Sequence, residues 1–168
     1  MRHTLLTKEY DKALGDLIRY NLKAHGLDIP GTVYFDDGLY VLSTFYSEKP
    51  DKRCYFVLLD DDDRLLGGIG LAECDFFENC AELQKLYLDD SVKGQGLGYK
   101  LISMIEEKAK ELGYERMYLE THSNLKVALH TYERSGYVLI DRPETVMHSS
   151  MNRFYLKELT DISDPKLQ

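Results

Sequence analysis

Three closely spaced glycines follow an apolar stretch in segment 86–102, which reads LYLDDSVKGQGLGYKLI. Gly94, Gly96 and Gly98 stand directly before an amphipathic helical pattern. Glycine lets the backbone approach an anion closely, and the first N–H groups of a helix point outward with the positive end of the helix dipole behind them. Lys93 adds a positive charge at the entrance. The segment therefore predicts a cradle for the phosphate groups of a nucleotide.

The glycine spacing alone does not identify that nucleotide. A dinucleotide-binding fingerprint needs its third glycine three residues after the second, whereas Gly98 follows Gly96 by two. A Walker loop ends in Gly-Lys-Ser/Thr, and here Gly98 is followed by Tyr99. The remaining alternative is a plain helix start with spare glycines, which is disfavoured because glycines weaken helix initiation.

The composition fits one globular domain spanning residues 1–168. The chain has 43% apolar residues, enough for a sizeable core. It carries 21 Lys plus Arg against 29 Asp plus Glu, a net charge of −8. That balance argues against a nucleic-acid partner, which would require a basic face, and is compatible with a cationic small-molecule substrate.

Neither a membrane span nor a metal site is expected. The apolar runs are too short to cross a bilayer, and no charged-then-apolar leader opens the sequence. The cysteines Cys54, Cys74 and Cys80 are odd in number and form no C-x-x-C pair, and the histidines lack metal-ligand spacing. We expect a cytoplasmic protein with reduced thiols and no metal.

Periodicity and turn residues predict an alternation of strands and helices. The expected strands are 3–6, 54–59, 65–74, 81–88, 116–120, 137–140 and 151–159. One expected helix begins after Thr7 and ends at Gly26. The others span about 39–47, about 95–112 and 123–135. A meander followed by helix crossovers implies an α/β (α+β) fold with a mixed, mostly antiparallel central sheet of six to seven strands flanked by helices.

This order of elements resembles the GNAT superfamily of acetyl-CoA-dependent N-acetyltransferases. Two segments carry the resemblance: KGQGLG after the strand LYL, and NLKVALHTYERSGY over residues 124–137. Lys93 stands where the family more often has Arg, which keeps the charge but loses the guanidinium fork. The resemblance implies acetyl-CoA as donor and a primary amine as acceptor.

The resemblance also implies the residues that hold the donor. The cradle would bind the pyrophosphate of coenzyme A, and the strand containing Leu86 and Leu88 would lend backbone groups to the pantetheine arm, in a sheet splayed open near a bulge. The cofactor-binding residues so implied are Leu86, Leu88, Lys93, Gly94, Gln95, Gly96, Leu97, Gly98, Asn124 and Tyr132.

Amide formation needs a base, oxyanion donors and an acid that protonates the leaving thiolate. The resemblance implies Tyr132 as the candidate acid, and Asn124, Ala128 and Tyr132 form a row along one helix face; the alternative is a tyrosine packed in the core. Glu82 is the candidate base. Glu73 competes with it, since hairpin pairing would bring the two carboxylates together and raise one pKa.

Other roles stay open at this stage. Water can replace a dedicated base, and the oxyanion donor is expected to be a backbone N–H near residues 86–88. His122 and His130 have no evident partner and are read as non-catalytic. Acceptor specificity falls to the two N-terminal helices, segment 31–37 and loop 141–149, with the aromatic and acidic candidates Tyr34, Phe35, Asp36, Asp37, Asp75 and Glu78.

The leading hypothesis is an enzyme that transfers the acetyl group directly in a ternary complex, because no cysteine lies in a motif that activates a thiolate. The alternatives are a non-catalytic acetyl-CoA sensor and another nucleotide-binding protein. The chain is expected to be a monomer or a homodimer, and its terminal strand with Phe154, Tyr155 and Leu156 could pair with a neighbour.

Overall fold

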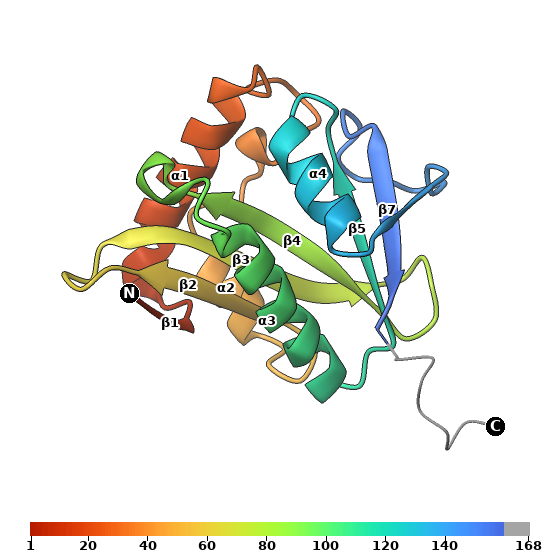
Figure 1. The fold of residues 1–168 in the computed structure, drawn as a ribbon, viewed down its shortest axis with the longest axis horizontal. Coiled ribbons are helices and arrows are strands. Elements are labelled where there is room, and N and C mark those ends of the chain that lie inside the picture. Colours follow the sequence, from red (N-terminus) through yellow and green to blue (C-terminus); the bar gives the residue numbers. More distant parts are fainter. Residues whose placement is uncertain (160–168) are drawn as a thin grey trace.

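A seven-stranded mixed sheet organises the fold in the order β1-β2-β3-β4-β5-β7-β6 (Figure 1). The computed structural model describes residues 1–159. All neighbouring strands are antiparallel except β4 and β5, which are parallel. The strands are β1 (Arg2–Leu5), β2 (Cys54–Leu59), β3 (Leu65–Cys74), β4 (Cys80–Leu88), β5 (Arg116–Thr121), β6 (Val138–Ile140) and β7 (Arg153–Glu158). The predicted mixed, mostly antiparallel sheet is confirmed.

The helices cover both faces of this sheet. They are α1 (Asp11–Ala24), α2 (Leu42–Ser47), α3 (Leu97–Glu111) and α4 (Lys126–Arg134), with short 3-10 helices η1 (Lys8–Tyr10), η2 (Val33–Phe35) and η3 (Asp90–Val92). Apolar side chains of α1 and α2 pack on one face, with Tyr55 and Val57 of β2. Those of α3 and α4 pack on the other face, with Ile69 and Leu83. Figure 1 shows α3 crossing one face of the strands.

Helix starts lie later than the sequence-based expectation. The segment after Thr7 begins as the 3-10 helix η1 before α1, and α3 begins at Leu97 rather than about 95. The helix predicted over 39–47 begins at Leu42, and Leu39 is buried without being helical. The helix predicted to begin after Ser123 starts at Lys126. The reason is local competition, because the backbone N–H of Ser123 donates to Asn152 Oδ1 and that of Asn124 donates to His122 Nδ1. The long-range bond to Asn152 and the local bond to His122 together hold the segment before α4 in an irregular turn.

The terminal strand β7 is internal to the sheet. It pairs with β5 on one side and with β6 on the other. The prediction that Phe154, Tyr155 and Leu156 could pair with a neighbouring molecule is therefore wrong, because their backbone groups are already used. The edges of the sheet are β1 and β6.

Two features are absent from residues 1–159. No helix there is both long and apolar enough to cross a bilayer. No group of three or more His, Cys, Asp or Glu side chains there is arranged to hold a metal ion.

Candidate active site

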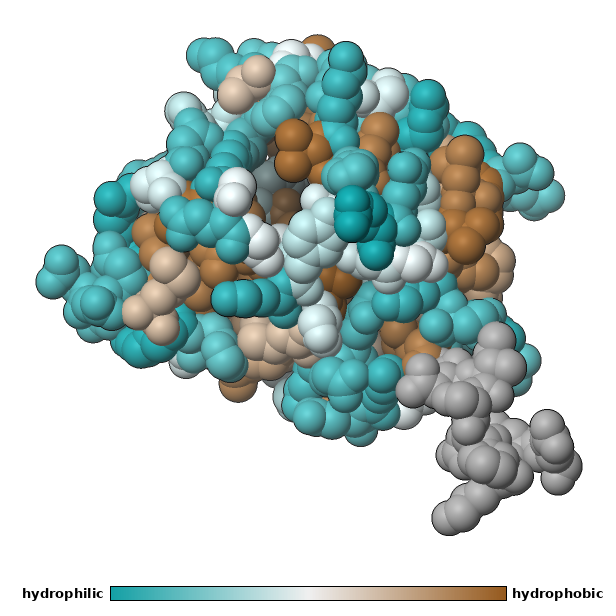
Figure 2. Space-filling model, viewed as in Figure 1, coloured by the Kyte–Doolittle hydropathy of each residue, from teal (hydrophilic) through white to brown (hydrophobic). Residues whose placement is uncertain are grey.

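The parallel strands β4 and β5 separate and open a hollow between them. They pair only from Cys80 to Glu82, which faces Tyr118, and then diverge (Figure 1). A cavity of about 500 Å³ opens there. It is lined by residues of α1, β4, β5, α4 and the glycine-rich segment 93–98, called the glycine segment below. The space-filling view shows the surface hollowed between α1 and α4 (Figure 2). A ligand in this gap would reach both faces of the sheet.

A bulge in β4 shapes one wall of the cavity. Gly68 pairs with Tyr87 and Gly70 with Gln84, so Lys85 and Leu86 together face a single residue of β3. Lys85 has a φ of 50°, the left-handed region that non-glycine residues rarely occupy. Its carbonyl oxygen accepts a hydrogen bond of 2.7 Å from the hydroxyl of Tyr55.

Glycines of β3 make room for that hydrogen bond. A Cβ added at Gly68 or Gly70 would lie 2.4 Å from the ring of Tyr55, because the ring lies flat against these positions. The glycine-rich sequence of β3 thus lets Tyr55 cross the strand and hold the bulge.

The glycine segment builds the start of α3 as a cluster of free donors. Gly94 and Gly96 have φ values of 75° and 74°, and a Cβ at either would meet nothing within 4 Å. The N–H of Lys100 bonds to the carbonyl of Gly96. The N–H groups just before it therefore have no partner within the helix and point out of its first turn. An anion fits this open, donor-rich space.

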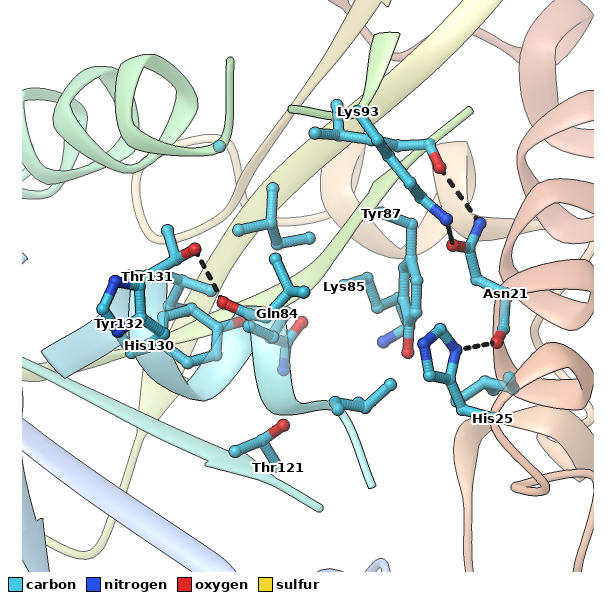
Figure 3. A pocket seen from close by; sticks show the side chains of 18 of the residues that line it. Asn21, His25, Gln84, Lys85, Tyr87, Lys93, Thr121, His130, Thr131 and Tyr132 are labelled. Carbon is cyan, nitrogen blue, oxygen red and sulfur yellow. Dashed lines mark hydrogen bonds between the residues drawn. The ribbon is translucent and has the colours of Figure 1, made fainter. Parts of the chain in front are cut away.

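Lys93 lies at the entrance to this space and also contacts α1. Its Nζ lies 2.8 Å from Asn21 Oδ1, as Figure 3 shows. The same Nζ lies 2.6 Å from Asp90 Oδ1. The amide of Asn21 in turn donates to the carbonyl of Leu88, at 3.2 Å. Asn21 therefore joins α1 to the end of β4 and to the glycine segment. Sequence reasoning missed it, because an Asn on the apolar face of a helix carries no motif.

Most of the predicted donor-binding residues line the cavity. They are Leu86, Leu88, Lys93, Gly94, Gly96, Leu97, Gly98 and Tyr132. The side chains of Gln95 and Asn124 are turned elsewhere. Gln95 Nε2 donates to the carbonyl of Ser91, and Asn124 Nδ2 donates to the carbonyl of His25.

Tyr132 reaches the cavity from α4. It is buried, and burial raises the pKa of its phenol well above the ordinary value, so the hydroxyl stays protonated at neutral pH. Within residues 1–159 that hydroxyl makes no hydrogen bond with protein groups. Its ring contacts Tyr137 and Tyr155, with centroids 6.0 and 6.4 Å away. The ring is thus held in the core, and the hydroxyl is available to a ligand.

Glu82 has the electrostatics of a base that works near neutral pH. Burial, with the nearby charge of Glu120, raises the pKa of its carboxyl to about 7. Gln84 orients it, since Gln84 Nε2 donates to Glu82 Oε2 at 3.2 Å. The hydroxyl of Tyr46 on α2 donates to the side-chain oxygen Oε1 of Gln84 at 2.7 Å. This chain from α2 fixes the carboxylate at the point where β4 and β5 part.

Glu73 does not meet Glu82, which corrects the expected pairing. Glu73 lies opposite Ala81 and Glu82 opposite Ala72, so the two carboxylates project from opposite faces of the sheet. Glu73 instead contacts Arg53 and Lys49, and the hydrogen bond from Arg53 lowers the pKa of Glu73 to about 2. A carboxylate so firmly ionised is a poor base. The neighbouring carboxylate of Glu82 is Glu120.

A cluster around His148 closes the far side of the cavity. His148 lies 3.0 Å from Asp36 and 3.2 Å from Glu120, which also accepts from the Tyr118 hydroxyl at 3.1 Å. Its hydrogen bonds with Asp36 and then Glu120 raise the pKa of His148 to about 9. Sequence reasoning missed His148, since its partners lie 28 and 112 residues away along the chain.

The remaining acidic candidates do not all gather at the cavity. Asp36 joins the His148 cluster, but Asp75 and Glu78 line a separate surface hollow near the β3–β4 turn.

The aromatic and histidine candidates are also divided. Tyr34 lies under the Arg19 guanidinium, 4.3 Å from the ring centroid, and Phe35 is exposed. His130 lines the cavity from α4, whereas His122 binds backbone and Asn152 outside it.

Known proteins resemble this chain in sequence and in structure. The sequence model described as "Acetyltransferase (GNAT) family" matches residues 22–137. The chain is 35% identical over 138 residues to the uncharacterized N-acetyltransferase YjgM of Escherichia coli (strain K12), covering 81% of each protein.

Solved structures share the fold at low sequence identity. A GNAT-family acetyltransferase of Staphylococcus aureus Mu50 superposes with a TM-score of 0.82 and 21% identity, covering 95% of this chain and 99% of that one. The PaiA N-acetyltransferase of Thermoplasma acidophilum, solved with coenzyme A, gives a TM-score of 0.71 and 20% identity, covering 94% and 99%.

Proposed function

Because this chain belongs to the GNAT family of acetyltransferases, we propose that it moves the acetyl group of acetyl-CoA directly to a primary amine. One observation carries the proposal. A single cavity joins the donor-rich start of α3 to Tyr132 and to Glu82, so an anion site and two proton-transfer groups share one space. The coenzyme A bound to the Thermoplasma relative supports the choice of donor.

Residues of the glycine segment would hold the pyrophosphate of the donor. The unpaired N–H groups at the start of α3 would bind its oxygens, with Gln95 contributing through its backbone and Lys93 through its charge. The diverging end of β4, at Leu86 and Leu88, would lend backbone groups to the pantetheine arm. Asn124 would act by fixing the entry to α4 through its bond to His25.

Glu82 and Tyr132 would move the protons. At neutral pH an aliphatic amine is protonated, with an ordinary pKa of roughly 10.4, so Glu82 accepts its proton directly or through water. The freed nitrogen attacks the thioester carbonyl, and backbone N–H groups near the β4 bulge stabilise the charge on its oxygen. As the carbon–sulfur bond breaks, Tyr132 donates its proton to the sulfur. The second proton leaves the attacking nitrogen and passes through water to Tyr132, which restores the phenol and leaves a neutral amide.

The other expectations form part of the same proposal. We propose that residues 1–168 form one domain, since strands from β1 to β7 share one sheet. We propose that the acceptor is a small molecule whose amino group is protonated, and so cationic, in its free form. A cytoplasmic location, a metal-free reaction and a monomeric or homodimeric state remain predictions.

Two measurements test this function. Calorimetry on the purified full chain should detect binding of coenzyme A and acetyl-CoA, with no competition from ATP or NAD. A free-thiol assay should then detect coenzyme A release with members of an amine panel. Absence of binding to any coenzyme A thioester contradicts the proposal. Tight binding without consumption of acetyl-CoA across the panel favours the sensor alternative.

A further inference from the structure

Lys85 is the one charged residue that the β4 bulge turns into the cavity. Its left-handed φ of 50° occurs inside a strand, whereas Asp63 and Asn79, the other non-glycine residues with positive φ in residues 1–159, lie in the turns at the ends of β3. Such strain persists only where surrounding contacts hold it, and the Tyr55 bond to the Lys85 carbonyl does so. The placement of the Lys85 side chain is thus built into the sheet.

The ammonium of Lys85 has no direct partner. It lines the cavity, and within residues 1–159 it makes no hydrogen bond and no ion pair. Figure 3 shows its side chain between Gln84 and Tyr87, directed into the same space as theirs. Burial lowers the pKa of Lys85, while the more distant carboxylates of Glu82, Asp36 and Glu120 act in the opposite direction. A partly buried cation without a partner is costly, and an anion beside it would remove that cost.

The carboxylates around the cavity differ in how many side chains of the protein already bind them. Asp36 and Glu120 both contact His148, and Glu120 also accepts from Tyr118. Glu82 has one bond, from the neutral amide of Gln84. The charged groups left for a ligand are therefore Glu82 and Lys85, three residues apart on the same strand.

From this pairing we propose that the acceptor is a compact amine that also carries an anionic group, a carboxylate or a phosphate, which Lys85 binds while the amine lies at Glu82. The inference rests on the proposed acetyl transfer and narrows its acceptor. Three residues of strand span about 10 Å, and both side chains enter one cavity, so a short molecule can reach both. A polyamine would place a second cation beside Lys85 and is disfavoured.

Four amines that share an aminoethyl group test the proposal: β-alanine, phosphoethanolamine, β-alaninamide and ethylenediamine. The wild type should show a kcat/KM for β-alanine or phosphoethanolamine at least about tenfold above that for the other two, as expected for one charged hydrogen bond. The better of these two anionic amines identifies carboxylate or phosphate as the preferred group.

Variants of Lys85 should change this selectivity through KM. In Lys85→Met the ratio of kcat/KM for the anionic amine to that for β-alaninamide should fall about tenfold, and Lys85→Glu should favour ethylenediamine. Lys126→Met, an exposed lysine at the start of α4, is the matched control and should behave as the wild type. Circular dichroism melting checks that each variant is folded.

Two results would overturn the inference while acetyl transfer stands. One is equal use of all four amines by the wild type, and the other is an unchanged ratio in Lys85→Met. If no amine is acetylated, acetyl transfer itself fails. Calorimetry with phosphoethanolamine and β-alanine in the presence of coenzyme A then decides the role of Lys85, and equal heats in wild type and Lys85→Met overturn it.

Discussion

Glu82 and Tyr132 come from opposite faces of the sheet and meet only because β4 and β5 separate between them. Glu82 lies on the face covered by α2, through Gln84 and Tyr46. Tyr132 belongs to the cluster formed with α3 on the other face. One residue has its pKa near neutrality and the other stays protonated, so the two are suited to opposite proton transfers.

Replacing Glu82 by Gln tests the base. The base must be deprotonated, and its pKa is raised to about 7, so kcat/KM of the wild type should fall as pH drops below 7. Glu82→Gln should lower kcat/KM at pH 8 by about 100-fold and remove that inflection, as measured in pH–rate profiles. Glu73→Gln is the control, because Glu73 lies on the other face, and it should keep turnover and inflection. An unchanged profile in Glu82→Gln would assign proton removal to water.

Replacing Tyr132 by Phe tests the acid. The change removes only the hydroxyl, so the ring contacts with Tyr137 and Tyr155 remain. We expect kcat to fall roughly 100-fold, while the Kd for acetyl-CoA measured by calorimetry changes less than about twofold. Tyr137→Phe, a buried neighbour that does not line the cavity, should leave kcat unchanged. Equal turnover in Tyr132→Phe and wild type would show that the thiolate leaves without this acid.

At the scale of elements, the start of α3 and the bulge of β4 both depend on backbone conformations that glycines allow. The helix start offers N–H groups because glycines with positive φ lead into it. The bulge persists because β3 has glycines where the ring of Tyr55 must pass. In both cases the missing side chain of glycine leaves space, before α3 for a ligand and at β3 for the ring of Tyr55.

Gly96→Ala separates the anion site from simple backbone strain. The φ of 74° makes alanine unfavourable by about 1 kcal/mol, and the new methyl would lie in the open space before α3. We expect coenzyme A to bind about tenfold more weakly in calorimetry. Gly113→Ala is a matched control at the other end of α3, with a φ of 89° and equal open space. It should show a similar loss of stability with no loss of affinity, and equal affinity losses in both variants would refute the anion site.

At the scale of the molecule, the His148 cluster connects three parts of the chain around the cavity. Asp36 follows η2, Glu120 belongs to β5, and His148 lies in the loop between β6 and β7. The same loop is held by the N–H of Ser150, which donates to the carbonyl of Gly31. A Cβ at Gly31 would lie 2.4 Å from the Ser149 hydroxyl, so the two segments are closely fitted.

The cluster predicts a pH-dependent contribution to stability. The folded pKa of His148, about 9, lies above its ordinary value of 6.5. Its contribution should therefore be complete below pH 6.5, decrease as pH rises, and vanish above about 9. Denaturant unfolding of wild type and His148→Gln should show a stability difference that shrinks over this range.

The control for this experiment is His122→Gln. Burial lowers the pKa of His122, so the sign is reversed and the difference from wild type should change in the opposite direction with pH. Parallel stability curves for wild type and His148→Gln from pH 6 to 10 would contradict the proposed charge on His148.

Local pattern was enough to predict the elements and the glycine-rich segment that leads into α3. The bounds of β2 and β3 were predicted to the residue, because alternation, turn residues and glycines act over a few positions. The glycine segment was recognisable for the same reason, since a helix start is made by consecutive residues. The start of α4 was not predicted, because it depends in part on the bond from Ser123 to Asn152, which lies 29 residues away.

The amino-acid sequence by itself determined the order of strands and helices, the mixed sheet and the donor-rich loop, since each depends on neighbours in the chain. Only the tertiary structure decided that Glu120, not Glu73, is the carboxylate near Glu82, and that His148 and Asn21 join distant segments. Strand register sets which side chains share a face, and a shift of one residue reverses it. The chemistry of the cavity therefore depends on pairing between strands, which no local pattern encodes.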